Sequence, residues 1–538
     1  MRKPTSNFME SQKSIEKRGK KRTRKGQPAG PWVTARKLVQ YSALIIFIVL
    51  FIWSQRDGWP GKVVNIPMRL DPLLMLAHLL ASRTLLAGSA LALIILFLTL
   101  VFGRAWCGWI CPLGTTLDLF PLRGGHRKRS EPAERWRSVK YTLLLLILVA
   151  ALFGNLTLLF FDPLTIWFRT MTVSIWPAAD QIITAAESFL YQAPFLAEPV
   201  STLDQWLRPA LLPTSPAYYR DTLLFAGIFL SVIALNLFAT RFWCRYICPL
   251  GGLLGLLSKV ALFKRQVDEE CKGCVLCTNV CPTGTIDPTN GYRSDPGECT
   301  LCMNCVETCP RGLGSFKPTV SLAEWKEYDP GRREALVAIG AAAVSIALFR
   351  SDLFARRESP FLLRPPGVRE NNTDVVAYSK CIRCGECMRS CPTHAIQPAV
   401  FEAGAEGLGS PVLIMRLGFC DYSCNACSQI CPVQAIPQMG LVEKRMQVIG
   451  RAYIDQNRCI PWSDHRPCVV CLEMCPLPKK AVQVEETQVW SLDGGSVTLQ
   501  LPHVVRDLCI GCGICEYQCP VSGEAAIRVF SPKAPVQF

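Results

Sequence analysis

Histidine is scarce in this sequence, with five in 538 residues, and several common cofactor motifs are missing. No C-x-x-C-H occurs, which argues against covalently attached haem. Neither a G-x-G-x-x-G after a strand nor a G-K-[ST] loop is present, so nicotinamide, flavin and ATP sites find no support. With so few imidazoles, histidine ligands to a metal are also in short supply.

Acidic residues are rare near the N-terminus, and the net charge of +16 is concentrated there. Residues 1–37 contain twelve Lys or Arg and only two Glu. No aromatic residues are interleaved with this charge, so we expect no nucleic-acid partner. The block directly precedes an apolar run, where positive charge keeps a segment cytoplasmic. That run is long and lacks a small-residue cleavage site, so we do not expect a removable signal peptide.

Apolar residues are concentrated in four runs, 38–54, 85–102, 141–161 and 222–239. Each approaches the ~20 residues that cross a bilayer. The loop 103–140 carries eight Lys or Arg, whereas the loop 162–221 carries three Arg against six acidic residues. By the positive-inside rule, we expect a four-span unit in a bacterial inner membrane with both of its ends cytoplasmic.

Cysteine, in contrast, is abundant, and six short runs contain 24 of the 28 cysteines. Four runs follow C-x2-C-x2-C-x3-C-P, and two are widened in the first gap only. The strict runs are Cys271, Cys274, Cys277, Cys281; Cys299, Cys302, Cys305, Cys309; Cys381, Cys384, Cys387, Cys391; and Cys509, Cys512, Cys515, Cys519. The widened runs are Cys420, Cys424, Cys427, Cys431 and Cys459, Cys468, Cys471, Cys475.

This spacing is typical of bacterial [4Fe–4S] ferredoxins. A zinc site prefers two separated C-x2-C pairs, and a disulfide framework needs no such repeat. We therefore predict six [4Fe–4S] clusters and a protein that carries single electrons. His465, in the widened gap of the fifth run, is expected to be a surface loop residue, with a ligand or proton-coupled role as the alternative.

In two-cluster ferredoxins, the fourth cysteine of each run binds the cluster of the other run. This rule predicts that Cys309 joins the first run and that Cys281 joins the second. For the four later runs, adjacent and nested pairing both remain open, because spacing alone does not choose between them.

The last four cysteines lie in two copies of one motif, WCGWICPLG and WCRYICPLG, which contain Cys107, Cys111, Cys244 and Cys248. Asp71-Pro-Leu and Thr84-Leu-Leu precede the first copy, and Asp162-Pro-Leu and Thr222-Leu-Leu precede the second. The order indicates a duplicated helical hairpin, a parallel repeat.

Residues four apart share a helix face, so two facing pairs of this kind supply four thiolates. Our hypothesis is that the four motif cysteines bind a seventh iron–sulfur centre at the cytoplasmic membrane surface. Free redox thiols are one alternative. A structural disulfide is the other, which a reducing cytoplasm disfavours.

Arg332 and Arg333 precede a 15-residue apolar stretch, 335–349. At ~1.5 Å per residue it would be about 22 Å long, short for a bilayer helix. Its length suits a twin-arginine export signal. The alternative is an interfacial helix, with everything after it still cytoplasmic.

The expected fold is an α-helical membrane domain of four spans plus a fifth short apolar helix, with α+β ferredoxin-like domains. The expected boundaries are a basic tail 1–37, a membrane domain 38–260, a two-cluster ferredoxin domain 261–325, the apolar segment 326–355 and a four-cluster domain 356–538.

The motifs also resemble known families. The spans with the two WC…CPLG motifs, followed by two ferredoxin runs, resemble the NapH membrane ferredoxin-type proteins and the related membrane part of NosR-type regulators. The chain from Arg332 onward resembles the NapG/MauM family, whose second and third runs are widened in the same way.

The resemblance implies a quinol dehydrogenase component that passes electrons from membrane quinol to a periplasmic acceptor, such as a nitrate reductase system or a c-type cytochrome. It also implies that the four-cluster domain is periplasmic, while the tail and first two clusters are cytoplasmic. A redox-sensing or maturation factor for a respiratory or methylamine-oxidising enzyme is the alternative.

This arrangement requires electrons to cross a ~30 Å hydrocarbon core. The seventh centre would form part of the bridge, and bound quinone could be a second carrier. The sequence offers His78, Asp71 and Asp162 as proton acceptors, although both Asp-Pro pairs are also typical of helix caps.

Overall fold

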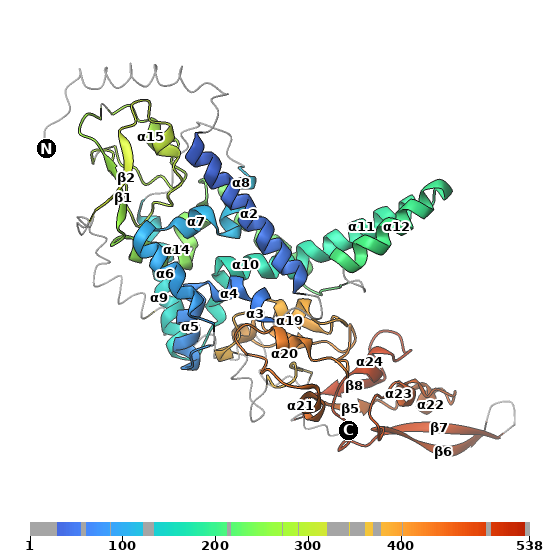
Figure 1. Ribbon diagram of the computed structural model, residues 1–538. Coiled ribbons are helices and arrows are strands. Elements are labelled where there is room, and N and C mark those ends of the chain that lie inside the picture. The colour runs from blue at the N-terminus through green and yellow to red at the C-terminus, as the bar shows by residue number, and fades with distance from the viewer. Residues whose placement is uncertain are drawn as a thin grey trace.

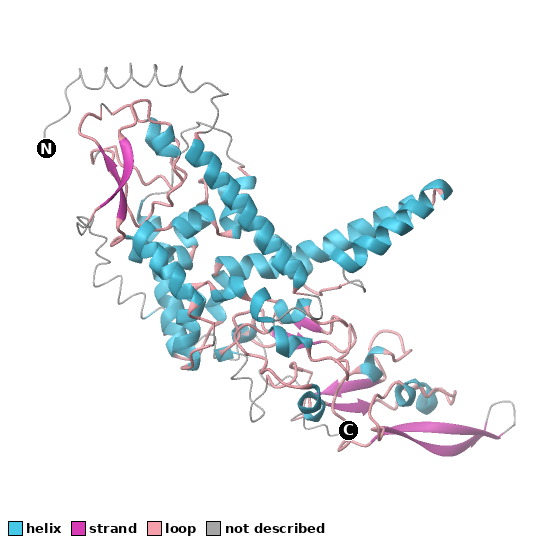
Figure 2. Cartoon of the chain, viewed as in Figure 1, coloured by secondary structure: helices cyan, strands magenta, loops and turns pink. Residues whose placement is uncertain are grey.

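A computed structural model describes residues 30–54, 61–86, 88–121, 134–211, 217–271, 273–288, 290–319, 340, 344, 361–368, 378–400, 402–490 and 496–532. In this part of the chain, helices form one body with a loop-rich lobe at either end (Figure 1). Among the residues that the structure describes, strands occur in the lobes and not in the helical body (Figure 2). The basic tail lies outside the described residues, as does the apolar segment 326–355 except for residues 340 and 344, which are helical.

The longest described helix is α2, Pro31–Trp53, which begins seven residues before the predicted span. Pro31 is its first residue, where the missing N–H costs no hydrogen bond. Within the described residues, α2 is the one helix long and apolar enough to cross a membrane. Five shorter apolar helices accompany it, at Pro72–Ser82, Leu91–Phe102, Ser138–Leu152, Thr222–Leu237 and Pro249–Ser258.

The other three predicted spans are interrupted rather than continuous. α6 begins only at Leu91, after Gly88 in a left-handed conformation (φ +98°). α9 ends at Leu152, just before Gly154 (φ +75°), and a 3-10 turn follows at Thr157–Phe161. α13, Thr222–Ala234, continues as a 3-10 turn, Leu235–Leu237. Sequence hydropathy does not register these breaks, because the broken segments remain apolar.

The duplicated Asp-Pro motifs begin equivalent helices, α5 (Pro72–Ser82) and α10 (Pro163–Thr170). Asp71 Oδ1 accepts hydrogen bonds from the backbone N–H groups of Leu73 and Leu74. Asp162 Oδ2 accepts the equivalent two bonds in α10. The helix-capping interpretation of both aspartates is therefore confirmed. In addition, the two carboxyl groups are buried and interact with each other, which places the two repeats in contact.

The remaining elements of the helical body are short, apart from a projecting helical hairpin. They are α3 (Gly61–Val64), α4 (Ile66–Arg69), α7 (Ala105–Trp109), α8 (Pro112–Leu119), a 3-10 turn (Glu134–Arg137), π-helical turns (Met171–Ile175 and Trp243–Ile247) and α14 (Pro249–Ser258). The hairpin of α11 (Trp176–Leu190) and α12 (Pro194–Leu211) extends away from the body (Figure 1). Arg208 of α12 pairs with Glu187 of α11.

The first lobe follows α14 and has one antiparallel pair, β1 (Phe263–Val267) with β2 (Gly314–Pro318). Two single-turn helices, α15 (Leu276–Asn279) and α16 (Asn304–Glu307), lie within its cysteine runs.

In its described residues, the C-terminal lobe contains three antiparallel pairs, six short helices and a 3-10 turn, Ala405–Gly407. The pairs are β3 (Ile396–Pro398) with β4 (Pro411–Leu413), β5 (Arg451–Ile454) with β8 (Ile527–Phe530), and β6 (Val482–Trp490) with β7 (Ser496–Val504). The helices are α19 (Glu386–Arg389), α20 (Ala426–Ile430), α21 (Leu441–Met446), α22 (Ile460–Ser463), α23 (Val470–Glu473) and α24 (Ile514–Tyr517).

The two lobes contact opposite ends of α2. Near its start, the Val33 backbone N–H donates to Glu307 Oε1 of the first lobe (2.8 Å). Near its end, Phe51 O accepts from Arg389 Nε of the C-terminal lobe (2.7 Å). At ~1.5 Å per residue, the eighteen positions between these anchors span about 27 Å. That length is close to the ~30 Å hydrocarbon core of a bilayer.

Candidate iron–sulfur sites

In the first lobe, the second run is completed by a cysteine of the first run. Cys281 lines one cavity together with Cys299, Cys302 and Cys305. Cys271, Cys274 and Cys277 gather separately, around the Tyr292 side chain. The placement of Cys281 follows the exchange of fourth cysteines that the ferredoxin rule predicts.

Cys309, the cysteine predicted to join Cys271, Cys274 and Cys277, has a sulfur surrounded by backbone donors. The N–H groups of residues 311–314 point at it and lower the pKa of its thiol, although partial burial opposes them. Donors of this kind stabilise a thiolate and tune a bound cluster. Cluster ligation itself stays a prediction.

The four cysteines of the WC…CPLG motifs come together between the two repeats. Cys107, Cys111, Cys244 and Cys248 are all buried and interact electrostatically with one another. We call this group the cysteine cage. Two thiols come from each repeat, which is the arrangement that the duplication predicts.

Two arginines connect the two repeats at the cage, and the sequence analysis did not predict them. Arg104 donates to Cys244 O of the other repeat (3.3 Å), and Arg241 donates to Cys107 O in return (3.1 Å). Each arginine stands three residues before the first cysteine of its own motif. The full repeat is therefore R-x-W-C-x3-C-P-L-G, and comparison of the two copies would have revealed these arginines.

The surroundings of the cage bear on its alternatives. All four cysteines are free thiols, so the structure contains no disulfide here. Burial raises the pKa of the Cys111 and Cys248 thiols well above the ordinary value, whereas reactive thiols have a lowered pKa. A [4Fe–4S] cubane spreads its thiolates over four irons, and the four thiols with the two nearby guanidinium groups suit that group.

The cage is tied directly to the first lobe. Trp109 Nε1 donates to Leu301 O (2.9 Å), and a Cβ on Gly108 would lie 2.1 Å from Thr300 O. Arg241 interacts electrostatically with both Cys244 and Cys302, so it stands between the cage and the cavity of the second run.

A buried charge cluster supports the same junction. Glu298, the residue before Cys299, pairs with Arg104 (3.1 Å) and with Lys140 of α9. All three side chains are almost fully buried. A pair in these surroundings is costly to break, because one charge would remain buried alone.

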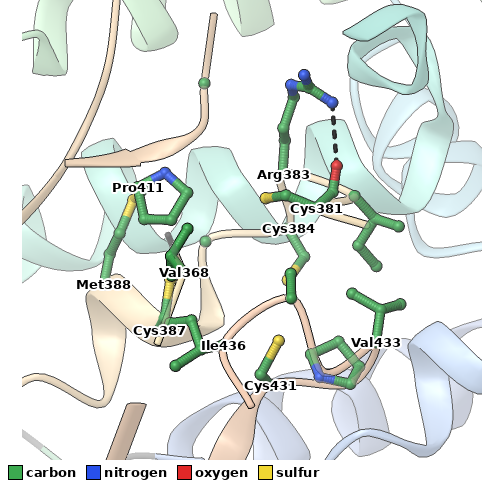
Figure 3. Close-up of a pocket in the computed structure, with 15 residues that line it drawn as sticks. Val368, Cys381, Arg383, Cys384, Cys387, Met388, Pro411, Cys431, Val433 and Ile436 are labelled. Carbon is green, nitrogen blue, oxygen red and sulfur yellow. Dashed lines mark hydrogen bonds between the residues drawn. The ribbon is translucent and has the colours of Figure 1, made fainter. Parts of the chain in front are cut away.

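In the C-terminal lobe, the third run is completed by the last cysteine of the fourth. Cys381, Cys384, Cys387 and Cys431 line one cavity, and their side chains converge there (Figure 3). Val368, Val433 and Ile436 supply apolar walls. Arg383 Nη1 donates to Cys381 O (3.0 Å).

The other three groups show the same exchange between adjacent runs. Cys391 interacts with Cys420, Cys424 and Cys427; Cys475 lines a cavity with Cys509, Cys512 and Cys515; and Cys519 interacts with Cys459, which interacts with Cys468 and Cys471. The pairing question left open by the sequence is thus answered in favour of adjacent runs.

The four groups form a series whose order differs from the sequence. The Cys420 N–H donates to Cys512 O (2.8 Å), which joins the group of the fourth run to that of the sixth. Cys515 in turn interacts with Cys471 of the fifth run. Starting from Cys381, the order of the runs is third, fourth, sixth and fifth.

The cavity of the third run lies next to the helical body, and hydrogen bonds join the two. Arg383 Nη2 donates to Thr157 Oγ1 (3.0 Å), and Asn155 Nδ2 donates to Glu406 Oε1 (3.2 Å). Arg169 of α10 interacts with Cys381 and Cys384. The first C-terminal group therefore adjoins the end of the body opposite the cysteine cage.

The remaining candidate residues have defined places. His78 is buried in α5, where Nδ1 lies 3.1 Å from Ser82 Oγ. His465 is exposed in a loop, as its surface interpretation predicts.

The exchange of fourth cysteines makes a specific prediction. Cys281→Ser should abolish or weaken the cluster of Cys299, Cys302 and Cys305, while Cys309→Ser should affect the cluster of the first run. The measurement is low-temperature electron paramagnetic resonance of each reduced variant, since the two clusters should be perturbed separately. If Cys281→Ser alters the signal that Cys271→Ser alters, the exchange is disproved.

Comparisons with known proteins match several of the segments that carry the cysteine motifs. A family model described as "4Fe-4S binding domain" matches residues 84–130 and again 222–267, once for each repeat. Two further models with the same description match residues 268–284 and 296–312, and residues 375–397 and 502–522.

Similar proteins fall into two groups. Ferredoxin-type protein NapG of Escherichia coli K12 is 32% identical over 196 residues, which are 35% of this chain and 79% of that protein. Methylamine utilization ferredoxin-type protein MauM of Methylorubrum extorquens is 32% identical over 216 residues, 38% of this chain and 90% of that protein. Ferredoxin-type protein NapH of Haemophilus influenzae is 22% identical over 270 residues, 48% of this chain and 78% of that protein. No solved structure matches the chain.

Proposed function

The chain belongs to the NapG/MauM family of ferredoxin-type proteins and also contains a part similar to NapH proteins, and we propose that it conducts electrons through a membrane. The donor would be the quinol pool, and the acceptor a periplasmic redox protein. Six [4Fe–4S] clusters and a seventh centre in the cysteine cage would carry the electrons.

The observation that carries this proposal is the placement of seven cysteine groups along one molecule. Two groups lie in the first lobe, the cage adjoins them, and four groups follow one another in the C-terminal lobe. The apolar helical body separates the cage from the C-terminal series. A protein that only stored clusters would not need them in sequence on both sides of such a body.

The membrane topology is part of the proposal. The lobes are anchored to α2 about 27 Å apart, and Arg137 before α9 also reaches the first lobe, through Thr283 O (3.3 Å). Asn155 after α9 reaches the C-terminal lobe. The chain would then cross the membrane four times, at α2, α6, α9 and α13. Breaks within them are tolerated where protein packs around the backbone. Basic residues in the tail and in the loop 103–140 support a cytoplasmic first lobe.

The quinol donor and periplasmic acceptor are taken from the family that the sequence resembles. Adding a quinol to anaerobic membranes should reduce the clusters of the C-terminal lobe. The reduction would be measured as a decrease in the visible absorbance of these clusters. Cys431→Ser, which removes a thiol from the group nearest the helical body, should block reduction of the groups beyond it. Normal electron flow together with an unassembled partner enzyme in a deletion strain would instead indicate a maturation factor.

A further inference from the structure

Arg169 of α10 is a buried positive charge that lacks a negative partner. The residue is 1% exposed. Its Nη2 donates to Phe160 O (3.4 Å), and the guanidinium group lies 3.6 Å from the centre of the Phe160 ring. The other two guanidinium nitrogens, Nε and Nη1, are buried and have no hydrogen-bond partner. Because burying an unpaired charge is costly, this arrangement indicates that an anion completes the site.

The groups around Arg169 narrow the choice of anion. Within the described part of the chain, no carboxylate pairs with this arginine. The groups that interact with it electrostatically are Arg383, which is also positive, and the thiols of Cys384 and Cys381. Both thiols belong to the third run. The negative charge that balances Arg169 would therefore come from the thiolates of that run.

The unpartnered Nη1 lies at the wall of the third-run cavity. A Cβ on Gly409 would lie 3.2 Å from Arg169 Nη1. Gly409 lines the cavity in which the cysteine side chains of this site converge (Figure 3). On the backbone side, a Cβ on Gly385 would lie 3.7 Å from Arg169 Cα. Gly385 stands between the second and third cysteines of the run, so the cysteine loop packs closely against α10.

The duplication gives Arg169 a counterpart in the first repeat. Arg169 and His78 each stand seven residues after the capping aspartate of their own repeat. His78 is buried and interacts electrostatically with Lys380, the residue before Cys381. The two repeats therefore place equivalent side chains beside the same cysteine run. Because arginine is not deprotonated in proteins, the second repeat supplies a permanent positive charge there.

We propose that Arg169 is the counter-charge of a [4Fe–4S] cluster in the third run and that it raises the reduction potential of that cluster. The cluster and its four thiolates form an anion, which gains one further negative charge when it accepts an electron. A fixed positive charge stabilises the reduced form more than the oxidised form, whereas burial away from water has the opposite effect. Arg169 belongs to the helical body and the cysteines to the C-terminal lobe, so the potential depends on the contact between these two parts. The inference rests on the proposed function in that the third run holds a cluster.

Arg169→Met provides the test, because it removes the charge and keeps a long apolar side chain. The potential would be measured on the full-length protein by anaerobic redox titration followed by electron paramagnetic resonance. The signal of the third-run cluster would be recognised by its loss in Cys384→Ser. Arg169→Met should lower the equilibrium constant for reduction of this cluster about tenfold or more, which is a shift of about 59 mV or more to lower potential. This size is expected for unit charges about 10 Å apart at an effective dielectric constant of about 20.

Two further variants separate charge from structure. Arg169→Lys retains the charge and should keep the equilibrium constant within about threefold of the unaltered chain. Arg220→Met removes a 62% exposed arginine that pairs with Glu402 of the same lobe, and it should leave the potential unchanged. An unchanged potential in Arg169→Met, or an equal shift in Arg169→Lys, would overturn the assignment.

Iron content covers the case in which Arg169→Met does not hold the cluster. Loss of this cluster in Arg169→Met with its retention in Arg169→Lys would support the counter-charge, whereas its loss in both variants would contradict it. The proposed function is tested separately, by adding quinol to the unaltered chain. A shifted potential in Arg169→Met, together with a third-run cluster that quinol cannot reduce, would retain the role of Arg169 and count against the proposed function.

Discussion

The quadruple variant Cys107→Ser, Cys111→Ser, Cys244→Ser, Cys248→Ser is expected to contain about 24 irons per polypeptide, against about 28 in the unaltered chain. The physical reason is that the cage gathers two buried thiols from each repeat, enough for one further cubane. Electron transfer between the lobes should be lost at the same time, because the cage adjoins the first lobe through Arg241. Iron would be measured by elemental analysis of anaerobically purified protein.

Serine is close to cysteine in size, so the variant should still fold, and retained clusters in the other six groups would show it. A matched control is Cys519→Ser, at the far end of the series, which should leave electron transfer between the lobes intact. Equal iron counts near 24 for the unaltered chain and the quadruple variant would remove the cage from the set of cluster sites.

Arg389→Ala is expected to loosen the C-terminal lobe from the helical body by about 1.5–3 kcal/mol, the typical contribution of a hydrogen bond from a charged donor. Arg389 is 4% exposed, donates to Phe51 O and to Ser54 Oγ (3.1 Å), and stacks 3.7 Å from the centre of the Phe51 ring. Its removal leaves the buried carboxyl group of Glu386 without its electrostatic partner. Denaturant unfolding, followed by the visible absorbance of the clusters, would give the change in free energy.

The same interface supplies the control. Arg220 pairs with Glu402 at 3.1 Å, but the arginine side chain is 62% exposed. Arg220→Ala should therefore change stability by about 0–1 kcal/mol. The double variant Arg389→Met, Glu386→Gln should recover part of the loss, since it leaves no unpaired charge. Equal effects of Arg389→Ala and Arg220→Ala would contradict the proposed role of the buried Arg389 side chain.

The local cysteine patterns could be predicted from sequence because cluster ligands lie within a few residues of one another. The exchange of Cys281 followed from the same pattern. The pairing of the four later runs did not, because it depends on tertiary contacts such as the Cys420–Cys512 backbone bond. The order of the runs in space is likewise a property of packing between ferredoxin units.

The helical body was predicted less well, for a different physical reason. Hydropathy detects the apolar runs, yet it does not detect the left-handed glycines Gly88 and Gly154 that accompany the interrupted helices. The crossed bonds of Arg104 and Arg241 also join residues more than 130 positions apart. The interaction between the buried carboxyl groups of Asp71 and Asp162 could not be predicted either. The sequence indicates two helix caps, but it does not indicate that the two caps lie close together.

The most direct measurement is made on the full chain in sealed vesicles, anaerobically, with a reductant that cannot cross the membrane. Supplied on the side of the first lobe, it should reduce the clusters of the C-terminal lobe as well as those of its own side. The C-terminal clusters would be recognised by the loss of their signals in a Cys431→Ser, Cys391→Ser variant. Reduction confined to the first lobe in vesicles whose seven groups are all loaded would contradict conduction through the membrane.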